Sequence, residues 1–179
     1  AVIITITPED YGDSQDPLSG IAFQRKLEER AYQIGNGKVP VERYGSFKRA
    51  ILGIKTQEAP DGAEIIGMEK FMPCIRGQWI EAPVHEILPD ALNRAFIEGM
   101  EAFGRKIRGF NGDKVFIEGI ESRTSSPIRI LRTELAQSPA VEGLYPCGEG
   151  AGYAGGITSA AMDGIFVAEQ LARALQEEV

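Results

Sequence analysis

Three stretches of the chain repeat their apolar residues at helical spacing. They run from Pro17 to about Ile34, from about Pro89 to Ile107 and from about Gly156 to Glu177. Apolar residues that recur every three to four positions share one face of an α-helix, so each stretch predicts a long amphipathic helix. Asp16 favours a helix start at the first stretch, because aspartate caps N-termini and proline suits the first turn.

Short runs of apolar and β-branched residues predict the strands. The opening run, Ala1–Thr7, is typical of a buried strand that leads into a loop. Val115–Ile120 is predicted as a strand after a turn at 111–113, and Ile128–Leu131 as an extended piece. Gly143–Cys147 is predicted as a short buried strand before a glycine-rich loop.

The middle of the chain has the weakest pattern. Between Gly35 and Pro83 we expect irregular structure with at most short helices or strands, and then a short helical turn over Pro83–Ile87. Trp79 and Phe71 are expected to be core residues. Together the patterns predict a mixed α/β (α+β) fold, with long helices packed on a few strands.

Composition narrows the class of protein. The 179 residues are 43% hydrophobic and 25% charged, as in ordinary soluble globular proteins. The net charge of −7 weakly disfavours nucleic acid and anionic membrane surfaces as partners, although a local basic groove around Arg123, Arg129 and Arg132 stays open as an alternative. The apolar start, Ala1–Ile6, is too short to span a bilayer. One histidine and two distant cysteines predict no metal site and reduced, cytoplasmic thiols. Because the chain opens inside a predicted strand, we expect the natural protein to continue upstream.

The segment Gly148–Gly156 carries five glycines in nine residues and opens the last helix. Glycine admits positive φ and lets a ligand approach the backbone, and a helix start offers unpaired N–H groups with partial positive charge. The segment therefore suits an anionic or acceptor-rich ligand such as a phosphate. Close packing of loop and helix is the structural alternative. The spacing is neither the dinucleotide fingerprint nor a P-loop.

Two segments carry a resemblance to a known family. Glu121–Ile130 and Gly143–Ile157 closely resemble the C-terminal signature of the uncharacterised bacterial FAD-dependent dehydrogenases. The likeness is dense from Glu118 onward and poor between Gly53 and Trp79. Shorter pieces look like the same family's middle region: Asp16–Gly20, Phe23–Arg25 and Leu88–Pro89.

The resemblance implies the C-terminal part of an FAD-dependent oxidoreductase. It implies that residues 1–110 are part of an inserted substrate-type domain, and that 111–179 close an FAD-binding domain of the two-dinucleotide-binding flavoprotein type. Glu149 would bind the ribityl or phosphate-linker region, and N–H groups at Gly155, Gly156 and Ile157 would face flavin N1 and O2. The implied cofactor-binding residues are Gly148, Glu149, Gly150, Gly152, Gly155, Gly156, Ile157, Ser125 and Ser126.

Catalytic residues are less sharply indicated. Arg123 and Arg129 flank hydroxyl residues and a proline, which suits an anionic or carbonyl substrate or a nicotinamide phosphate near the flavin; ordinary surface ion pairs are the alternative. Tyr153 would stack near flavin, donate to substrate, or only pack. His85 is an acid–base candidate or a capping residue, and Cys147 a redox candidate or simple packing in a buried strand.

Several expectations concern the whole protein. The strand–turn–helix that grips the FAD pyrophosphate is absent from this sequence, so we expect a fragment that is colourless and inactive alone. NADH or NADPH is a possible reductant, and the substrate would be a small molecule. Exposed apolar surface would favour self-association. The rival functions are a non-catalytic interaction module and an enzyme that binds a different phosphorylated ligand.

Overall fold

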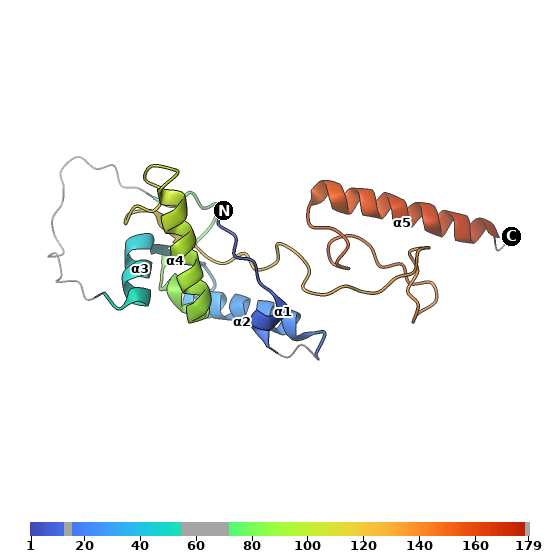
Figure 1. The fold of residues 1–179 in the computed structure, drawn as a ribbon, viewed down its shortest axis with the longest axis horizontal. Helices are drawn as coiled ribbons and strands as arrows, with labels where there is room; N and C mark the ends of the chain where they lie inside the picture. The colour runs from blue at the N-terminus through green and yellow to red at the C-terminus, as the bar shows by residue number, and fades with distance from the viewer. Residues whose placement is uncertain (13–15, 55–71, 178–179) are drawn as a thin grey trace. The chain divides into compact units, whose positions relative to one another are not determined.

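The computed structural model describes residues 1–12, 16–54 and 72–177, without the side chain of Glu177. They form two compact units, each described by itself below (Figure 1). The first unit comprises Ala1–Ile6 and Arg25–Ile120, and the second comprises Thr7–Gln24 and Glu121–Val179. The predicted boundary at residue 110 refers to domains of a larger protein and stays a prediction.

A small mixed sheet lies at the centre of the first unit. Strand β1 (Val39–Arg43) pairs in parallel with β2 (Trp79–Glu81), with Val39 opposite Trp79. On its other side β1 pairs antiparallel with β3 (Phe116–Glu118), with Glu42 opposite Ile117. The strand order is therefore β2-β1-β3.

Five α-helices and one 3-10 turn, η1 (Val84–Glu86), make up the remaining regular structure of the described residues. The second unit holds α1 and α5, whereas α3, α4 and η1 belong to the first unit. The bounds of the helices are Pro8–Tyr11 for α1, Ser19–Ile34 for α2, Tyr44–Leu52 for α3, Asp90–Gly104 for α4 and Ile157–Glu177 for α5.

The core of the first unit forms where β1 leads directly into α3. Val41, Tyr44 and Phe47 are almost completely buried, and the Phe47 ring lies 5.3 Å from the Phe96 ring of α4. Helices α3 and α4 are therefore packed side by side (Figure 1). The Tyr44 hydroxyl donates to Glu101 Oε1 at 2.8 Å. Burial, and then this hydrogen bond, raise the pKa of Tyr44.

The three long predicted helices are confirmed as α2, α4 and α5. Helix α2 begins at Ser19, two residues later than predicted, and Asp16 Oδ1 caps the turn before it by accepting the N–H of Leu18 at 2.9 Å. Helix α2 ends just before Gly35, as predicted. The chain turns so tightly there that a Cβ at this position would lie 2.1 Å from the carbonyl oxygen of Lys38, and therefore only glycine fits. The predicted turn at Pro83–Ile87 is confirmed as η1.

Two predicted strands are wrong. Ala1–Thr7 is paired with no strand among the described residues, and α1 follows it where a loop was expected. Gly143–Cys147 is not a strand either: Gly143 has φ +75° and Cys147 is exposed. Ile128–Leu131 joins no sheet, although the N–H of Ile130 donates to Ala151 O at 3.1 Å. Apolar, β-branched runs favour extended backbone, but a strand also needs a partner at the right register.

The weakly patterned middle contains β1, α3 and β2. Strand β1 was missed because Pro40 stands in its centre, where proline removes one backbone donor from the ladder. Trp79, which was expected to be a core residue, is only half-buried on β2. Phe71 lies outside the described residues.

The fold class is confirmed at the level of a mixed α/β chain with a small three-stranded sheet. Among the residues that the structure describes, no helix combines the length and apolarity needed to cross a bilayer.

The first testable prediction concerns the buried ring of Phe47. Phe47→Ala should destabilise the first unit by about 3–5 kcal/mol, because it removes buried contacts and leaves a cavity. Urea unfolding followed by the fluorescence of Trp79, the single tryptophan, measures this loss. Phe103→Ala is the control, since Phe103 is 42% exposed and should cost far less. Equal losses in the two variants would contradict the core described above.

Candidate functional site: the glycine-rich loop and the start of helix α5

The second unit presents the glycine-rich loop (Gly148–Gly156) directly before α5. Two turn hydrogen bonds close its first half: Gly152 N–H donates to Glu149 O at 2.9 Å, and Tyr153 N–H donates to Gly148 O at 3.0 Å. At the helix start, Gly155 N–H faces Ser159 Oγ at 3.4 Å. The first turn of a helix has N–H groups with no intrahelical acceptor, and Ile157 is 93% exposed. The Gly155 N–H is therefore used within the chain, whereas the N–H groups of Gly156 and Ile157 have no acceptor among the described residues.

Two of the glycines are required by the chain's own conformation. Gly152 has φ +83°, and a Cβ there would lie 2.3 Å from the carbonyl oxygen of Ile128. Gly148 has φ +72°, a left-handed conformation that side chains rarely adopt. The fold itself therefore accounts for these two positions, Gly152 through close packing and left-handed φ, and Gly148 through left-handed φ alone.

The other three glycines have no such explanation. A Cβ on Gly150 or Gly155 would meet nothing within 4 Å, and a Cβ on Gly156 would meet only Ser159 Oγ at 3.9 Å. None of the three has φ in the left-handed region. Within the part of the chain that the structure describes, glycine is needed there neither for conformation nor for packing.

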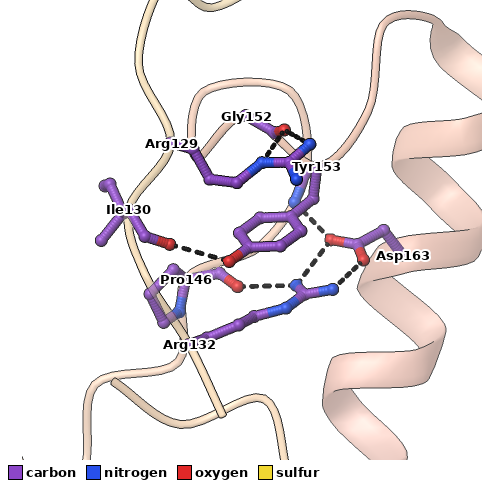
Figure 2. A network of polar contacts seen from close by, with 8 residues as sticks. Arg129, Ile130, Arg132, Pro146, Gly152, Tyr153 and Asp163 are labelled. Atoms are coloured by element: carbon purple, nitrogen blue, oxygen red, sulfur yellow. Dashed lines mark hydrogen bonds and ion pairs between the residues drawn. The ribbon is translucent and has the colours of Figure 1, made fainter. Parts of the chain in front are cut away.

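Tyr153 lies between two guanidinium groups (Figure 2). The Cζ of Arg132 is 3.6 Å from the ring centroid, and the Cζ of Arg129 is 4.9 Å from it. Arg129 also donates to Gly152 O from Nε at 3.1 Å and from Nη2 at 2.9 Å, and the Tyr153 hydroxyl donates to Ile130 O at 3.0 Å. The structure thus brings together two of the three predicted catalytic candidates.

An ion pair between Arg132 and Asp163 connects the loop to α5 (Figure 2). Nη2 of Arg132 donates to Oδ1 of Asp163 at 2.6 Å, and Nη1 donates to Oδ2 at 3.0 Å. Nη1 also reaches Pro146 O at 2.8 Å, and Gly148 N–H donates to Oδ2 at 2.7 Å. The side chains are 10% and 12% exposed, so this two-point contact is almost buried.

These contacts set the charge state of the pair. The hydrogen bonds from Arg132 hold the pKa of the Asp163 carboxyl below its ordinary value, with the Gly148 N–H acting in the same direction and burial opposing both. The hydrogen bond to Asp163 in turn raises the pKa of Arg132 against the effect of burial. Both groups are therefore charged at neutral pH.

The remaining predicted site residues differ in their surroundings. Ser126 Oγ contacts Gly150 O at 3.2 Å, which joins its segment to the loop, while Ser125 is exposed and its carbonyl accepts from Gln24 Nε2 at 3.3 Å. Glu149 is half-buried, with no hydrogen bond to its carboxylate among the described residues. Arg123 is exposed, and the carbonyl of its neighbour Ser122 accepts a hydrogen bond from Gln24 Nε2 at 2.9 Å.

The other candidates do not join the loop. His85, in the first unit, has its Nδ1 2.8 and 2.9 Å from the two carboxylate oxygens of Glu42, and its backbone N–H donates to the same group at 3.0 Å. Glu42 is only 7% exposed, so the contacts with His85 satisfy the hydrogen-bonding needs of a buried carboxylate. Cys147 is exposed and lies in no strand, which corrects the expected buried position. No cluster of three metal-ligating side chains exists among the described residues.

Sequence reasoning did not find the role of Arg132 or Asp163. A signal was present: Asp163 is the only charged residue between Ile157 and Ala168, in an otherwise apolar and small-residue stretch. A carboxylate among apolar residues of a helix is rarely buried unless a basic side chain pairs with it. Nothing local, however, identifies that partner as an arginine 31 positions earlier.

Comparison with known proteins relates this chain to a protein family and to a bacterial protein. A family model described as FAD-dependent protein, C-terminal domain-like, matches residues 1–124, so it ends before the glycine-rich loop. An uncharacterised protein of Clostridium beijerinckii is 39% identical over 173 residues, covering 96% of this chain and 30% of that protein. The chain thus spans less than a third of the length of this relative.

The second prediction separates the two classes of glycine. Gly152→Ala should destabilise the second unit by about 2–4 kcal/mol, because it combines a left-handed φ with a backbone collision. Gly150→Ala should change stability by no more than about 0.5 kcal/mol, since its Cβ enters open space. Hydrogen exchange of peptides that cover 126–153 measures both effects. A loss for Gly150→Ala as large as that for Gly152→Ala would refute the distinction.

The third prediction concerns Asp163 and pH. Because its folded pKa lies below the ordinary value of 3.8, its contribution to stability is complete well above that value and is lost as the pH falls through the folded pKa. Asp163→Asn should cost about 3–5 kcal/mol at pH 7, because it leaves an almost buried arginine unpaired, and less below pH 4.

Exchange protection of the Gly148 amide, followed by NMR from pH 7 to pH 3, measures this contribution. Asp113→Asn is the control: Asp113 also pairs with an arginine, Arg49, but its side chain is 73% exposed. We expect its effect to stay below about 1 kcal/mol. An Asp163→Asn penalty that does not change with pH would contradict the assignment.

Proposed function

Because this chain belongs to the family described as FAD-dependent protein, C-terminal domain-like, we propose that it supplies the flavin-contacting loop and helix of an FAD-dependent oxidoreductase. In this proposal, residues 111–179 close the FAD-binding domain, and residues 1–110 form part of a substrate-type domain. The strand–turn–helix that grips the dinucleotide belongs to another part of the flavoprotein.

The observation that carries the proposal is the set of glycines that the chain's own fold does not require. Gly150, Gly155 and Gly156 leave open space where side chains would fit without strain. A ligand that approaches the backbone closely needs such bare positions. An interaction module whose loop only packs a helix would need Gly148 and Gly152 but not these three.

The hydrogen-bond donors and acceptors of the loop match the polar groups of a flavin. The N–H groups at Gly155, Gly156 and Ile157 would face flavin N1 and O2, where the positive end of α5 favours negative charge, and the Gly155 N–H would exchange its 3.4 Å contact with Ser159 Oγ for the flavin. Glu149, with no side-chain partner among the described residues, would accept hydrogen bonds from ribityl hydroxyls, and Ser125 and Ser126 would lie toward the cofactor. When bound, the flavin supplies the acceptor for a hydride.

The arginine-rich segment would bind the substrate. Arg129 is held by the Gly152 carbonyl over the ring of Tyr153, so its guanidinium is already oriented at the exposed side of the loop. An oriented guanidinium binds a carboxylate, phosphate or polarised carbonyl. We propose Arg129, with Tyr153 and Arg123, as the residues that recognise such a group on a small-molecule substrate or on a nicotinamide reductant.

The exposed apolar residues of α5 support a place inside a larger domain. Ile157, Met162 and Ile165 are each more than 60% exposed. A helix with unburied apolar positions of this size is stabilised when another surface covers it. In the proposal, that surface is the rest of the FAD-binding domain, and in its absence the chain self-associates.

The fourth prediction tests the cofactor. In the longer flavoprotein that the proposal requires, Gly155→Ala should raise the dissociation constant of FAD at least tenfold, about 1.4 kcal/mol, because the new methyl group occupies cofactor space. Flavin fluorescence titration measures the constant. Gly99→Ala, at an equally open glycine of α4, is the control and should leave it unchanged.

The 179-residue chain alone should purify colourless. Two results would reject the proposal: a longer protein without bound flavin, or a Gly155→Ala variant that binds FAD as tightly as the parent. Thermal-shift comparison of FAD with NADPH and simple nucleotides on the same protein tests the rival phosphorylated ligands, because a ligand stabilises only the state it binds.

A further inference from the structure

The start of the glycine-rich loop and Tyr153 within it both contact one ion pair. Arg132 binds Pro146 O before the loop and lies 3.6 Å from the ring of Tyr153 within it. Asp163 accepts the N–H of Gly148, the first residue of the loop, at 2.7 Å, and is itself part of α5. We call Arg132, Tyr153 and Asp163 the loop clamp.

The loop clamp fixes α5 in rotation as well as in position. Asp163 lies six residues after Ile157 on the same helix. Its contacts with Arg132 and Gly148 therefore fix the rotation of α5 about its axis, and with it the orientation of the helix start. The guanidinium fork makes two parallel hydrogen bonds to the carboxylate, a geometry with little angular freedom. The N–H donors at residues 155–157 are therefore held in place before any ligand arrives.

Stability alone is a poor reason for this arrangement. Both partners are almost buried, and taking two charges out of water costs about as much as their attraction returns. Apolar side chains of similar size would stabilise such a position at least as well. What an ion pair adds is a defined geometry, which matters when backbone donors must meet a ligand without rearranging.

We propose that Arg132 and Asp163 are positioning residues of the flavin site: they act through the loop and through α5, and touch neither cofactor nor substrate. This inference rests on the proposed function. Loosening the loop clamp should cost affinity for FAD and should make the flavin reduction potential more negative, because the helix-start donors favour the reduced, anionic ring.

The test uses the longer flavoprotein in its FAD-bound form. Asp163→Asn should raise the FAD dissociation constant about tenfold or more and shift the potential to more negative values, both of which are measurable on the same sample. Asp113→Asn, which breaks an exposed pair, should change neither. A folded Asp163→Asn protein with parental affinity and potential would overturn the inference.

Arg132→Lys keeps the inference testable if Asp163→Asn fails to fold. This variant keeps the positive charge beside Asp163 but cannot make the two parallel hydrogen bonds of the guanidinium to the carboxylate. A smaller shift of the potential in the same direction supports the inference, and an unchanged potential overturns it. Gly155→Ala separates the two proposals: if it weakens FAD binding and the loop-clamp variants do not, the inference alone fails; if it has no effect, the proposed function fails.

Discussion

The second unit is organised by the two-point contact between Arg132 and Asp163. Its described residues include no strand and few buried apolar side chains, among them Ala136, Ala151 and Val167. In the first unit, by contrast, aromatic and aliphatic side chains of β1, α3 and α4 form a continuous core. Polar contacts between one guanidinium, one carboxylate and several backbone groups therefore hold the segments of the second unit in place, whereas apolar packing holds those of the first unit.

The sequence predicts the elements that depend on contacts between neighbouring residues. It does not predict the strands that depend on pairing with distant segments. The long helices follow from apolar periodicity, and Asp16 and Gly35 mark the two ends of α2 for reasons that involve only neighbouring residues. Strand β1 depends on partners around residues 80 and 117, which outweigh the unfavourable Pro40. Ala1–Thr7 has the composition of a strand but no partner strand among the described residues.

The candidate site was predictable in part for the same reason. Five glycines before a helix are visible in one short segment, and so is the nearby cluster of arginines. Which glycines the fold itself needs is not visible, because the neighbour of Gly152 is the carbonyl of Ile128, 24 positions earlier. The buried pair of Glu42 and His85 is likewise a contact between distant segments, formed only when η1 packs beside β1.

The contrast between the glycines has a consequence for how the sequence can diverge. In a descendant lineage that no longer bound the cofactor, selection for folding alone would still preserve Gly148 and Gly152. Positions 150, 155 and 156 would be free to accumulate alanine, serine or larger residues. Under the proposed function, the fold preserves the first set of positions and the cofactor preserves the second, so homologues that vary only at positions 150, 155 and 156 would be those that no longer bind the flavin.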